Sequence, residues 1–275
     1  MIDVVYQSVK QRVRRQKNRR IPEPAMVMSD LHQAQEFALA GVSEGGLAVT
    51  YELILLKLLK VAPEEGRALD IACGSGVLLS KIARERPNLD FLGIDLSDNM
   101  LELAKENFKN RGVSNAHLQK MNMFDIDTLE KNSFDLVTFN MAMHHCDNEA
   151  QVIDLINKSL KLLKKDGVLF MFDINRPKSD RMAVWLANRY NKKSGDYYYQ
   201  DSLNSYRAAF SFKEVQEILK KSDWKNYKHI EPPIGNFIQC VSTEVSPKKL
   251  KRKVSFQTFD QTVAYSLLAF LIGNL

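Results

Sequence analysis

The sequence predicts an α/β protein built on a doubly wound sheet of seven mostly parallel strands with an antiparallel last strand. Three observations support this fold class. Short apolar runs alternate with helical periodicity from residue 67 to residue 241, the first run ends in a glycine loop, and the second ends in Asp95. The expected strands are 67–72, 90–95, 116–120, 134–140, 167–173, 226–231 and 236–243. At 275 residues and 45% hydrophobic, the chain can bury the core of one large domain with extensions.

Local signals predict several of the helices between these strands. Ser97 is a candidate N-cap for a helix whose apolar stripe is Met100, Leu101, Ala104 and Phe108. A second stripe contains Val152, Ile153, Ile156, Leu160 and Leu163, and residues 165–167 (KDG) are expected to form the turn into the fifth strand. Ser211 and Glu214 have the spacing of a capping box, which predicts a third helix start.

The chain divides into three expected parts. Residues 1–65 form a basic arm and an N-terminal helical cap, residues 66–245 the sheet domain, and residues 246–275 a basic and apolar C-terminal extension. We expect residues 1–20 to be extended or helical but poorly anchored, and residues 21–24 to be a stiff connector because two prolines fix φ there. Helical periodicity over 29–40 and 48–60 predicts the cap. The segment 176–210 is longer than a connection needs and rich in tyrosine.

Much of the positive charge lies in two short segments. Residues 10–20 contain seven Lys and Arg and no acid, and residues 248–253 contain five, whereas the whole chain carries a net charge of +6. The intervening part is therefore net acidic, which does not favour nucleic acid as the partner of the folded surface. Solvated extensions are the favoured interpretation, and binding to a polyanion or an anionic membrane is the alternative.

The last residues, 263–275, form an apolar stretch of 13 residues, which is shorter than the roughly 20 residues needed to span a bilayer. We expect no transmembrane span. Packing against the chain's own domain or in a homodimer is favoured over contact with a membrane surface.

Cysteine usage points to a reducing, cytoplasmic environment. The three cysteines, Cys73, Cys146 and Cys240, are odd in number and widely spaced, with no C-x-x-C pair that would suggest zinc or a redox switch. We expect no bound metal. The first residues contain no apolar segment of signal-peptide length, so secretion by that route is not expected.

The glycine loop narrows the class of ligand that the chain is expected to bind. Residues 68–77 read ALDIACGSGV, and Asp95 follows Gly76 at the spacing of an acid that binds ribose hydroxyls. A dinucleotide site would have a third glycine where this chain has Leu79, and no G-x-x-x-x-G-K-[ST] phosphate loop is present in the sequence. A nucleoside without phosphates therefore fits best.

At these residues the sequence resembles the class I S-adenosylmethionine (SAM) dependent methyltransferases, which have a Rossmann-like fold. Their first motif is similar to D-x-G/A-C/T-G-x-G, with Ala72 in the place of a frequent glycine, and their second strand ends in Asp or Glu. The resemblance continues through residues 122–124, the run 133–145, and a helix, glycine turn and strand that end at Phe172.

The resemblance implies SAM as the cofactor and S-adenosylhomocysteine (SAH) as its product. Gly74, Ser75 and Gly76 would approach the methionyl part, with Asp70 organising the loop and Asp95 binding the ribose. Leu96 and Met123 would enclose adenine, with Asn122 at its amino edge. The expected cofactor site comprises Asp70, Ala72, Gly74, Ser75, Gly76, Asp95, Leu96, Met100, Asn122, Met123, Asn140 and Met141. In an open parallel sheet such residues meet at the carboxyl ends of the strands.

The expected function is methylation of a small organic acceptor, with an oxygen or nitrogen acceptor favoured. Methyl transfer is an in-line displacement that depends mainly on alignment. Where the acceptor must lose a proton, His144 and His145 are the candidate general bases, and a structural capping role is their alternative. Tyr51 is a candidate contact of the acceptor site, with ordinary helix packing favoured. The alternative functions are RNA or protein methylation through the basic arm, and a non-catalytic SAM-binding protein.

Overall fold

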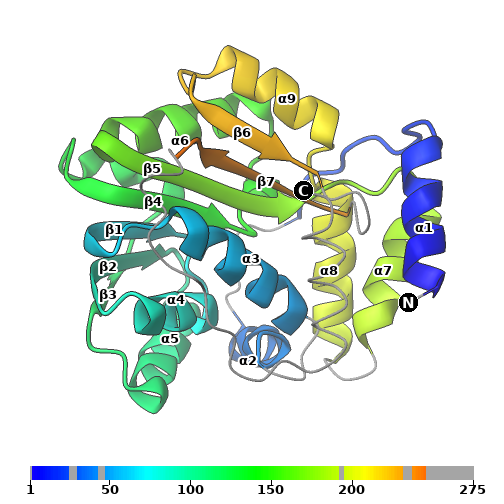
Figure 1. Cartoon of the computed structure of the whole chain (residues 1–275). Coiled ribbons are helices and arrows are strands. Elements are labelled where there is room, and N and C mark those ends of the chain that lie inside the picture. The colour runs from blue at the N-terminus through cyan, green and yellow to red at the C-terminus, as the bar shows by residue number, and fades with distance from the viewer. Residues whose placement is uncertain (1, 25–29, 43–46, 192–194, 232–236, 246–275) are drawn as a thin grey trace.

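The computed structural model describes the chain except residues 1, 25–29, 43–46, 192–194, 232–236 and 246–275. Its described part contains a seven-stranded sheet of order β3-β2-β1-β4-β5-β7-β6 (Figure 1). The strands are β1 Glu65–Ile71, β2 Asn88–Asp95, β3 Ala116–Lys120, β4 Phe134–Asn140, β5 Leu163–Ile174, β6 Tyr227–Ile230 and β7 Ile238–Thr243. β7 runs antiparallel to β5 and β6, and the neighbouring strands from β3 to β5 are parallel. The predicted sheet is confirmed.

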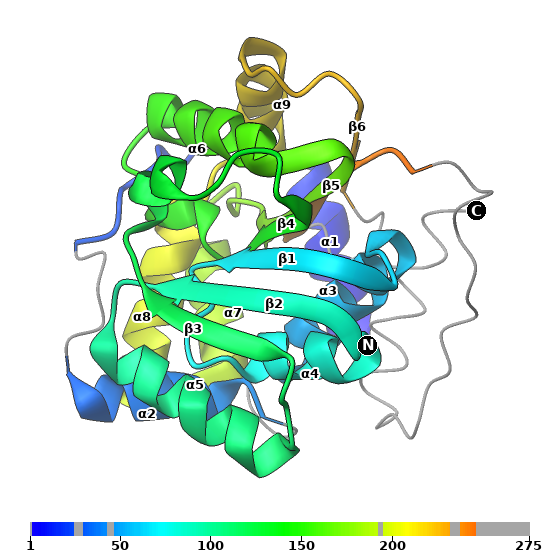
Figure 2. The same ribbon diagram turned by 90° about the vertical axis from the view of Figure 1, so that its left-hand side faces the viewer.

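Helices cover both faces of this sheet (Figure 2). On one face lie α3, α4 and α5, and on the other α6 and α9. Beyond the carboxyl ends of the central strands stand α7 and α8, with α1 beside them (Figure 1). The helices are α1 Ile2–Val13, α2 Leu31–Ala40, α3 Ala48–Val61, α4 Val77–Glu85, α5 Asp98–Arg111, α6 Glu149–Leu162, α7 Asp180–Asn191, α8 Asp196–Ala208 and α9 Phe212–Lys221, with two 3₁₀ turns, η1 Met123–Thr128 and η2 Met143–His145.

The core consists of two apolar layers, one on each face of the sheet. One layer joins α3 and α4 to the strands through residues such as Ile54, Leu79 and Phe170. The other joins α6 and α9 to the strands through residues such as Ile156 and Ile218. Each of these side chains is almost fully buried, and such burial contributes about 1.5–3 kcal/mol per residue. The strand ends between these layers are therefore held rigidly.

Two predicted helix starts are confirmed by their hydrogen bonds. Ser97 caps α5, because its Oγ accepts from the backbone N–H of Met100 at 3.3 Å. Ser211 and Glu214 form the expected capping box at the start of α9. Such caps pair backbone donors that have no partner inside the helix.

The predicted turn at residues 165–167 is wrong. These residues lie inside β5, which begins at Leu163 directly after α6 ends. Leu163 pairs with Phe134, and the register between β4 and β5 shifts before Leu136 pairs with Val168. Sheet pairing at the beginning of β5 thus overrides the local turn signal of Gly167.

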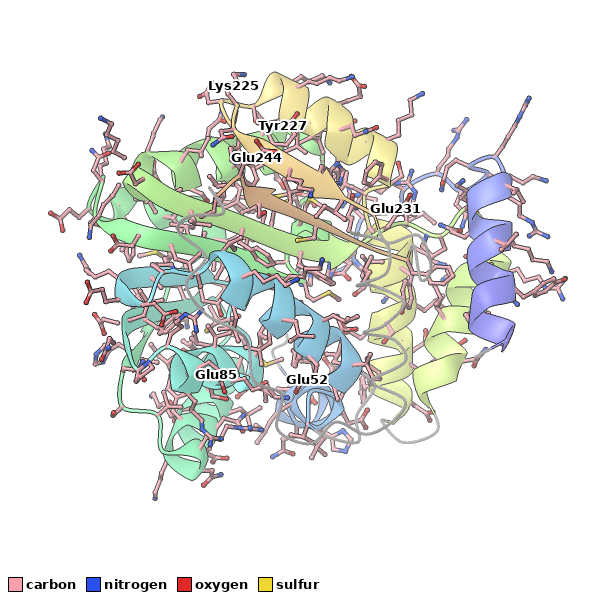
Figure 3. All side chains as sticks on the ribbon, in the orientation of Figure 1. Glu52, Glu85, Lys225, Tyr227, Glu231 and Glu244 are labelled. Atoms are coloured by element: carbon pink, nitrogen blue, oxygen red, sulfur yellow. The ribbon has the colours of Figure 1, made fainter. Side chains whose placement is uncertain are left out.

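The helix α3, the second of the two expected cap helices, is largely buried. Eight of its residues are buried, and it packs on α4 and on the sheet face. Glu52 of α3, labelled in Figure 3, forms an ion pair with Lys81 of α4. The helix α2 packs instead against α8 and α5. The second of the two expected cap helices therefore packs on the sheet, while the first packs on other helices.

The N-terminal segment, residues 2–24, is anchored, in contrast to the prediction. Gln11 is buried, donates to the carbonyl of Arg176 at 3.2 Å and accepts from the backbone N–H of Lys178 at 2.9 Å. Further along, the N–H of Ile21 donates to the carbonyl of Arg207. The sequence showed the charge of this segment but not these polar contacts to the connection between β5 and α7 and to α8.

The basic cluster 248–253 and the apolar stretch 263–275 lie outside the described residues, and their expected roles stay predictions. Within the described part of the chain, none of the helices combines the length and apolar character needed to cross a membrane. The proposed division at residues 65 and 245 also stays a prediction.

Candidate active site

The carboxyl ends of β1, β2, β4 and β5 meet at one edge of the sheet. The strand order reverses there, because β1 lies between β2 and β4. Polar side chains stand at or near all four strand ends: Asp70, Asp95, Asn140 and Asp173. Ligands of open α/β sheets bind at such a reversal, so this edge is the candidate site.

The loop after β1 has unusual backbone conformations. Ala72, Gly74 and Gly76 all have positive φ, at 56°, 54° and 66°. A Cβ added at Gly74 would meet nothing within 4 Å, whereas one at Gly76 would lie 2.8 Å from Cβ of Ala104 on α5. Gly74 thus leaves the loop open to a ligand, while Gly76 lets α5 pack closely against it.

Leu79, which replaces the third glycine of a dinucleotide motif, packs on β2 at Gly93. A Cβ at Gly93 would lie 2.7 Å from Cδ2 of Leu79 and 3.1 Å from Sγ of Cys73. The small residue needed for close packing therefore lies on the strand, opposite a large residue on α4. This exchange explains how a helix with Leu79 still packs tightly below the loop.

Asp95 connects the second strand to the glycine loop. Its carboxylate accepts from the backbone N–H of Gly74 and from that of Ser97, both at 2.9 Å. Burial raises the pKa of Asp95, and these two backbone donors oppose the rise. The acid is fixed at the rim of the open loop.

Asp70 is an acid with a strongly perturbed pKa. Burial, followed by the nearby charge of Asp95, raises its pKa to about 8, while a hydrogen bond from Asn140 opposes the rise. Repulsion from Asp95 thus helps to keep Asp70 protonated below about pH 8, and a cationic ligand would favour its ionised form.

The two predicted asparagines have different surroundings. Asn140 Nδ2 donates to Oγ1 of Thr138 at 2.7 Å, while its buried Oδ1 has no hydrogen-bond partner among the described residues. Asn122 Oδ1 accepts from the backbone N–H of Phe124 at 3.0 Å and caps η1. Asn140 therefore offers an unpaired acceptor, whereas the oxygen of Asn122 already has a donor.

The remaining expected cofactor residues surround the same edge. Ser75 is buried, and its carbonyl accepts from Asn107 Nδ2 at 2.8 Å. Met141 follows β4 with a φ of 54°, matching the strained Ala72 after β1. Leu96 is partly exposed, while Met100 and Met123 are buried. Whether these residues contact the cofactor stays a proposal.

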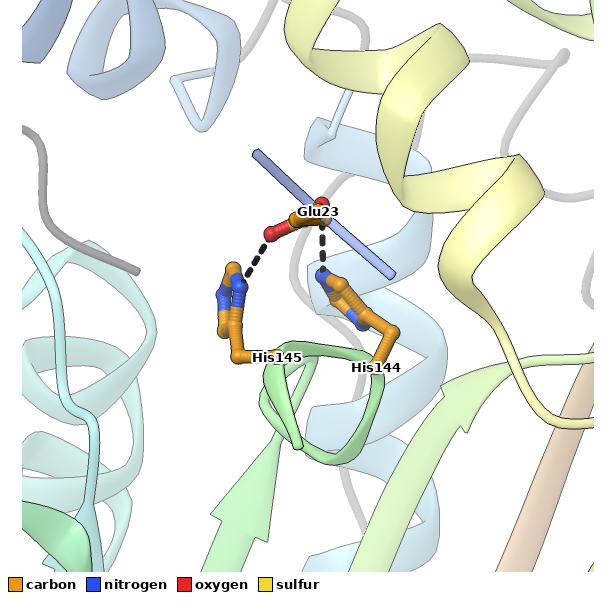
Figure 4. Close-up of side chains that lie close together, drawn as sticks. All are labelled: Glu23, His144 and His145. Carbon is orange, nitrogen blue, oxygen red and sulfur yellow. Dashed lines mark hydrogen bonds and ion pairs between the residues drawn. The ribbon is translucent and has the colours of Figure 1, made fainter. Parts of the chain in front are cut away.

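His144 and His145 converge on a carboxylate that the sequence did not suggest (Figure 4). His145 Nδ1 lies 2.5 Å from Oε2 of Glu23, and His144 Nε2 lies 4.0 Å from Oε1 of the same residue. On its other side, His144 Nδ1 lies 2.6 Å from Oδ1 of Asp173. We call Glu23, His144 and His145 the His–Glu cluster. One atom from each of its side chains lies within 4.8 Å of the others, so the cluster could hold a metal ion.

Charges around the cluster perturb its pKa values. Burial alone would lower the pKa of His144, but Asp173, Glu23 and Asp201 raise it to about 9. Burial opposes the charge of Glu23, yet the hydrogen bond from His145 and the charges of both histidines lower its pKa to about 2. Burial and the charge of Glu23 raise the pKa of Asp201 to about 6. The surrounding carboxylates thus stabilise the protonated form of His144.

Arg20 holds the loop that carries the histidines. Its guanidinium donates to the carbonyl oxygens of His144 at 3.0 Å, Asp147 at 2.5 Å and Cys146. It also donates to the carbonyl of Ala208 in α8 and lies 4.0 Å from the ring centroid of Phe210. This arginine of the basic segment is therefore engaged inside the protein rather than free to bind a polyanion.

Comparison with known proteins identifies the family. Residues 63–255 match the family model described as methyltransferase domain. The chain belongs to the methyltransferase domain family. This match confirms the predicted methyltransferase family.

Individual relatives match parts of this methyltransferase. It is 33% identical over 114 residues to a ubiquinone biosynthesis O-methyltransferase of Neisseria meningitidis, covering 41% of this chain and 46% of the relative. The chain thus spans about half the length of that curated relative.

Among solved structures, an O-methyltransferase family protein of Burkholderia thailandensis aligns with a TM-score of 0.57 at 16% identity, covering 77% of this chain and 60% of that one. The plantazolicin methyltransferase in complex with SAH aligns with a TM-score of 0.56 at 18% identity, covering 78% of this chain and 91% of that one. These two likenesses show the fold.

The residues of this methyltransferase fit SAM on physical grounds. SAM carries a sulfonium and an ammonium group, and the site offers two repelling carboxylates, Asp70 and Asp95, together with the unpaired Oδ1 of Asn140. The backbone at Gly74 is open to close approach. A cationic ligand with amino-group donors would relieve both the repulsion and the unpaired acceptor.

Sequence reasoning missed four residues of this region: Arg20, Glu23, Asp173 and Asp201. Asp173 follows the predicted fifth strand's apolar run and could have been suspected from its strand-end position. Glu23 stands between two prolines in a segment interpreted as a connector. Nothing in the local pattern of Arg20 or Asp201 distinguishes them from surface charges.

Proposed function

We propose that this chain transfers the methyl group of SAM to an oxygen or nitrogen atom of a small organic acceptor. The observation that carries the proposal is the joining of two sets of residues at one sheet edge. The turn η2, which carries both histidines, begins three residues after Asn140 at the end of β4, and the charge of His145 acts on Asp95, so the His–Glu cluster adjoins the residue proposed to bind the ribose. An acceptor between them would face the methyl group.

In this proposal the cofactor half of the site holds and orients SAM. Asp95 binds the ribose hydroxyls, while Asp70 and Asn140 are placed for the cationic methionyl end. The acceptor's lone pair then forms a bond to the methyl carbon, and the carbon–sulfur bond breaks with its electron pair staying on sulfur. Alignment of the three atoms supplies most of the rate enhancement for such a displacement.

The surroundings of the His–Glu cluster support a small acceptor. The helix α8 contacts η2, and α2 packs on α8, so helices stand over the strand ends (Figure 1). The N-terminal segment adds Glu23, whose side chain is only 7% exposed. A folded macromolecule would have to displace these elements. The name of the Neisseria relative, an O-methyltransferase of ubiquinone biosynthesis, supports an oxygen acceptor.

Methylation of RNA through the basic segment is less well supported. That hypothesis would use the basic residues of 10–20, and although Arg14, Arg15, Lys17 and Arg19 are exposed, Arg20 donates to four carbonyl groups of the protein.

Calorimetric titration with SAM and SAH tests the cofactor half. We expect micromolar binding by the full chain and about 10- to 100-fold weaker binding by Asp95→Ala, because the ribose loses a charged hydrogen-bond acceptor, which is worth about 1.5–3 kcal/mol. Asp90→Ala is the matched control, since Asp90 is an exposed acid on the same strand. Equal binding by Asp95→Ala and the unchanged protein would refute the ribose role.

The acceptor class is tested with SAM labelled in its methyl group. The labelled cofactor is supplied with a cell extract separated into small molecules, RNA and protein. We expect label to pass to the small-molecule fraction. Label found only in RNA or protein, or in no fraction despite SAM binding, would contradict the proposal.

A further inference from the structure

We propose that the His–Glu cluster is a binding site for one divalent transition-metal ion. Glu23, His144 and His145 supply one carboxylate and two imidazole groups, and both histidines direct a ring nitrogen at the same carboxylate (Figure 4). Among the described residues, this is the one group of three or more such side chains whose ligand atoms lie within 4.8 Å of one another.

The distances suit an ion after small side-chain movements. Zinc binds imidazole nitrogen and carboxylate oxygen at about 2.0–2.2 Å, so the ligand atoms around it stand roughly 3.3 Å apart. The two distances from Glu23 to the histidines, 2.5 and 4.0 Å, bracket that value. Rotations of the Glu23 side chain that move its oxygens by less than about 1 Å would bring both distances to about 3.3 Å.

Further residues hold the ligands in the way that metal sites require. His144 Nδ1 contacts Asp173 at 2.6 Å, which leaves Nε2 as the ligand atom and fixes the orientation of the ring. Ser205 Oγ donates to Glu23 Oε1 at 2.7 Å. Arg20 fixes the backbone of the loop through the carbonyls of His144, Cys146 and Asp147. The ligand set is therefore positioned before any ion binds.

The electrostatic surroundings also favour a cation. Three carboxylates, those of Glu23, Asp173 and Asp201, act on His144, and His144 Nδ1 lies 2.6 Å from Oδ1 of Asp173. Asp201 on α8 is partly buried, and it interacts electrostatically with Glu23 and both histidines. A divalent ion would neutralise more of this negative charge than a single proton on an imidazole does.

The donor set indicates the kind of ion. Imidazole nitrogen is a ligand for zinc, copper, iron and nickel, whereas magnesium and calcium prefer all-oxygen sites. Two histidines with one glutamate form a three-residue set that leaves a coordination position open in catalytic zinc sites. The structure therefore points to Zn²⁺ or a neighbouring first-row ion rather than Mg²⁺.

The metal's catalytic role rests on the proposed function. An acceptor hydroxyl at the open position would lose its proton to solvent more readily, because the cation stabilises the resulting oxyanion. The oxygen's lone pair then forms the bond to the methyl carbon, and the carbon–sulfur bond breaks with both electrons remaining on sulfur. The ion undergoes no change of oxidation state.

The test measures metal binding directly, without activity. Tag-free full-length protein is treated with chelator, dialysed, and titrated calorimetrically with Zn²⁺, Mn²⁺ and Mg²⁺, and metal retained after dialysis is counted by mass spectrometry. We expect one Zn²⁺ per chain with micromolar or tighter affinity, and Mg²⁺ binding at least 100-fold weaker.

Variants assign the binding to the cluster. Glu23→Gln and His145→Asn are expected to weaken Zn²⁺ binding at least 100-fold, and Asp173→Asn about 10-fold because it only orients a ligand. His117→Asn is the matched control, since His117 is an exposed histidine on β3. The affinity of this variant for Zn²⁺ is expected to be unchanged. Thermal melts without metal show whether each variant is folded, and 100 Kd of Zn²⁺ should stabilise the unchanged protein by about 2.7 kcal/mol.

Three results would overturn the proposal: no stoichiometric Zn²⁺ or Mn²⁺, unchanged affinity in folded Glu23→Gln and His145→Asn, or equal weakening by His117→Asn. Methyl transfer at full rate by metal-free protein would overturn the catalytic role alone. Absence of SAM binding and methyl transfer would instead refute the proposed function, and the metal titration would still be read independently.

Discussion

The two halves of the candidate site differ in how the chain builds them. The cofactor half comes from a continuous loop, residues 70–76, and from Asp95 at the end of the adjacent strand. The half around the His–Glu cluster brings together residues 122 positions apart, with Glu23 on the N-terminal segment and His145 after β4. The first half depends on local backbone geometry. The second depends on how the N-terminal segment, η2 and α8 pack together.

The comparison predicts that changes in the second half impair methyl transfer but not cofactor binding. Arg20→Ala is expected to have the largest effect, a fall in methyl-transfer rate of about 100-fold, since a displacement of about 1 Å at a reacting group can cost that much. Its SAM affinity should stay within twofold, because Arg20 contacts the loop of the histidines and not the glycine loop. Initial rates and calorimetric titration measure the two effects.

Arg19→Ala is the matched control for Arg20→Ala. Arg19 is the preceding arginine, it is exposed, and its removal changes the charge of the segment equally. Wild-type rates in Arg20→Ala, or an equal loss in Arg19→Ala, would show that the segment acts through its charge rather than through the carbonyl contacts.

The same difference explains what the sequence could predict. The sheet, the glycine loop and Asp95 were predicted because hydrophobic periodicity and positive-φ glycines are local properties. Glu23 and Asp201 were missed because their roles arise from tertiary packing of segments that carry no motif. The turn at residues 165–167 was wrongly predicted since pairing of Leu163 with Phe134 outweighs a local preference.

A smaller effect is expected from pH on the affinity of the cofactor half for SAM. SAM binding should strengthen up to tenfold per pH unit as pH rises toward 8 and level off above it, because a cationic ligand favours ionised Asp70, whose pKa is about 8. The groups around Asp70 include Asp95 on β2, Asn140 on β4, Tyr51 on α3 and Cys73 in the glycine loop. Titrations with SAM from pH 6 to 9 measure this dependence.

Asp70→Asn is the control variant for this pH dependence. Its weaker SAM binding should be nearly flat over the same range, and a slope equal to that of the unchanged protein would exclude Asp70 as the titrating group. The stability of the protein without SAM should instead fall as pH rises. The folded-state pKa of Asp70 is raised, so its contribution is complete below about pH 4 and is lost as pH rises through about 8.

The smallest expected effect concerns backbone strain in the cofactor half. Ala72 has a φ of 56°, a conformation that costs a residue with a Cβ about 1–2 kcal/mol. Ala72→Gly removes that cost but increases the entropy of the unfolded chain, which lowers the gain in stability by about 0.5–1 kcal/mol. We therefore expect a net stabilisation of about 0.5–1 kcal/mol, measured by chemical denaturation.

Asn132→Gly supplies the comparison for Ala72→Gly. Asn132 has a similar φ of 54° but lies in a turn between η1 and β4, and asparagine tolerates the left-handed region, so its replacement should not stabilise the protein. SAM affinity then decides what the strain at Ala72 does. If Ala72→Gly weakens SAM binding while stabilising the fold, the methyl side chain restricts the loop to its ligand-accepting conformation. Unchanged affinity would show that the neighbouring contact between Asp95 and the N–H of Gly74 is sufficient to hold the loop.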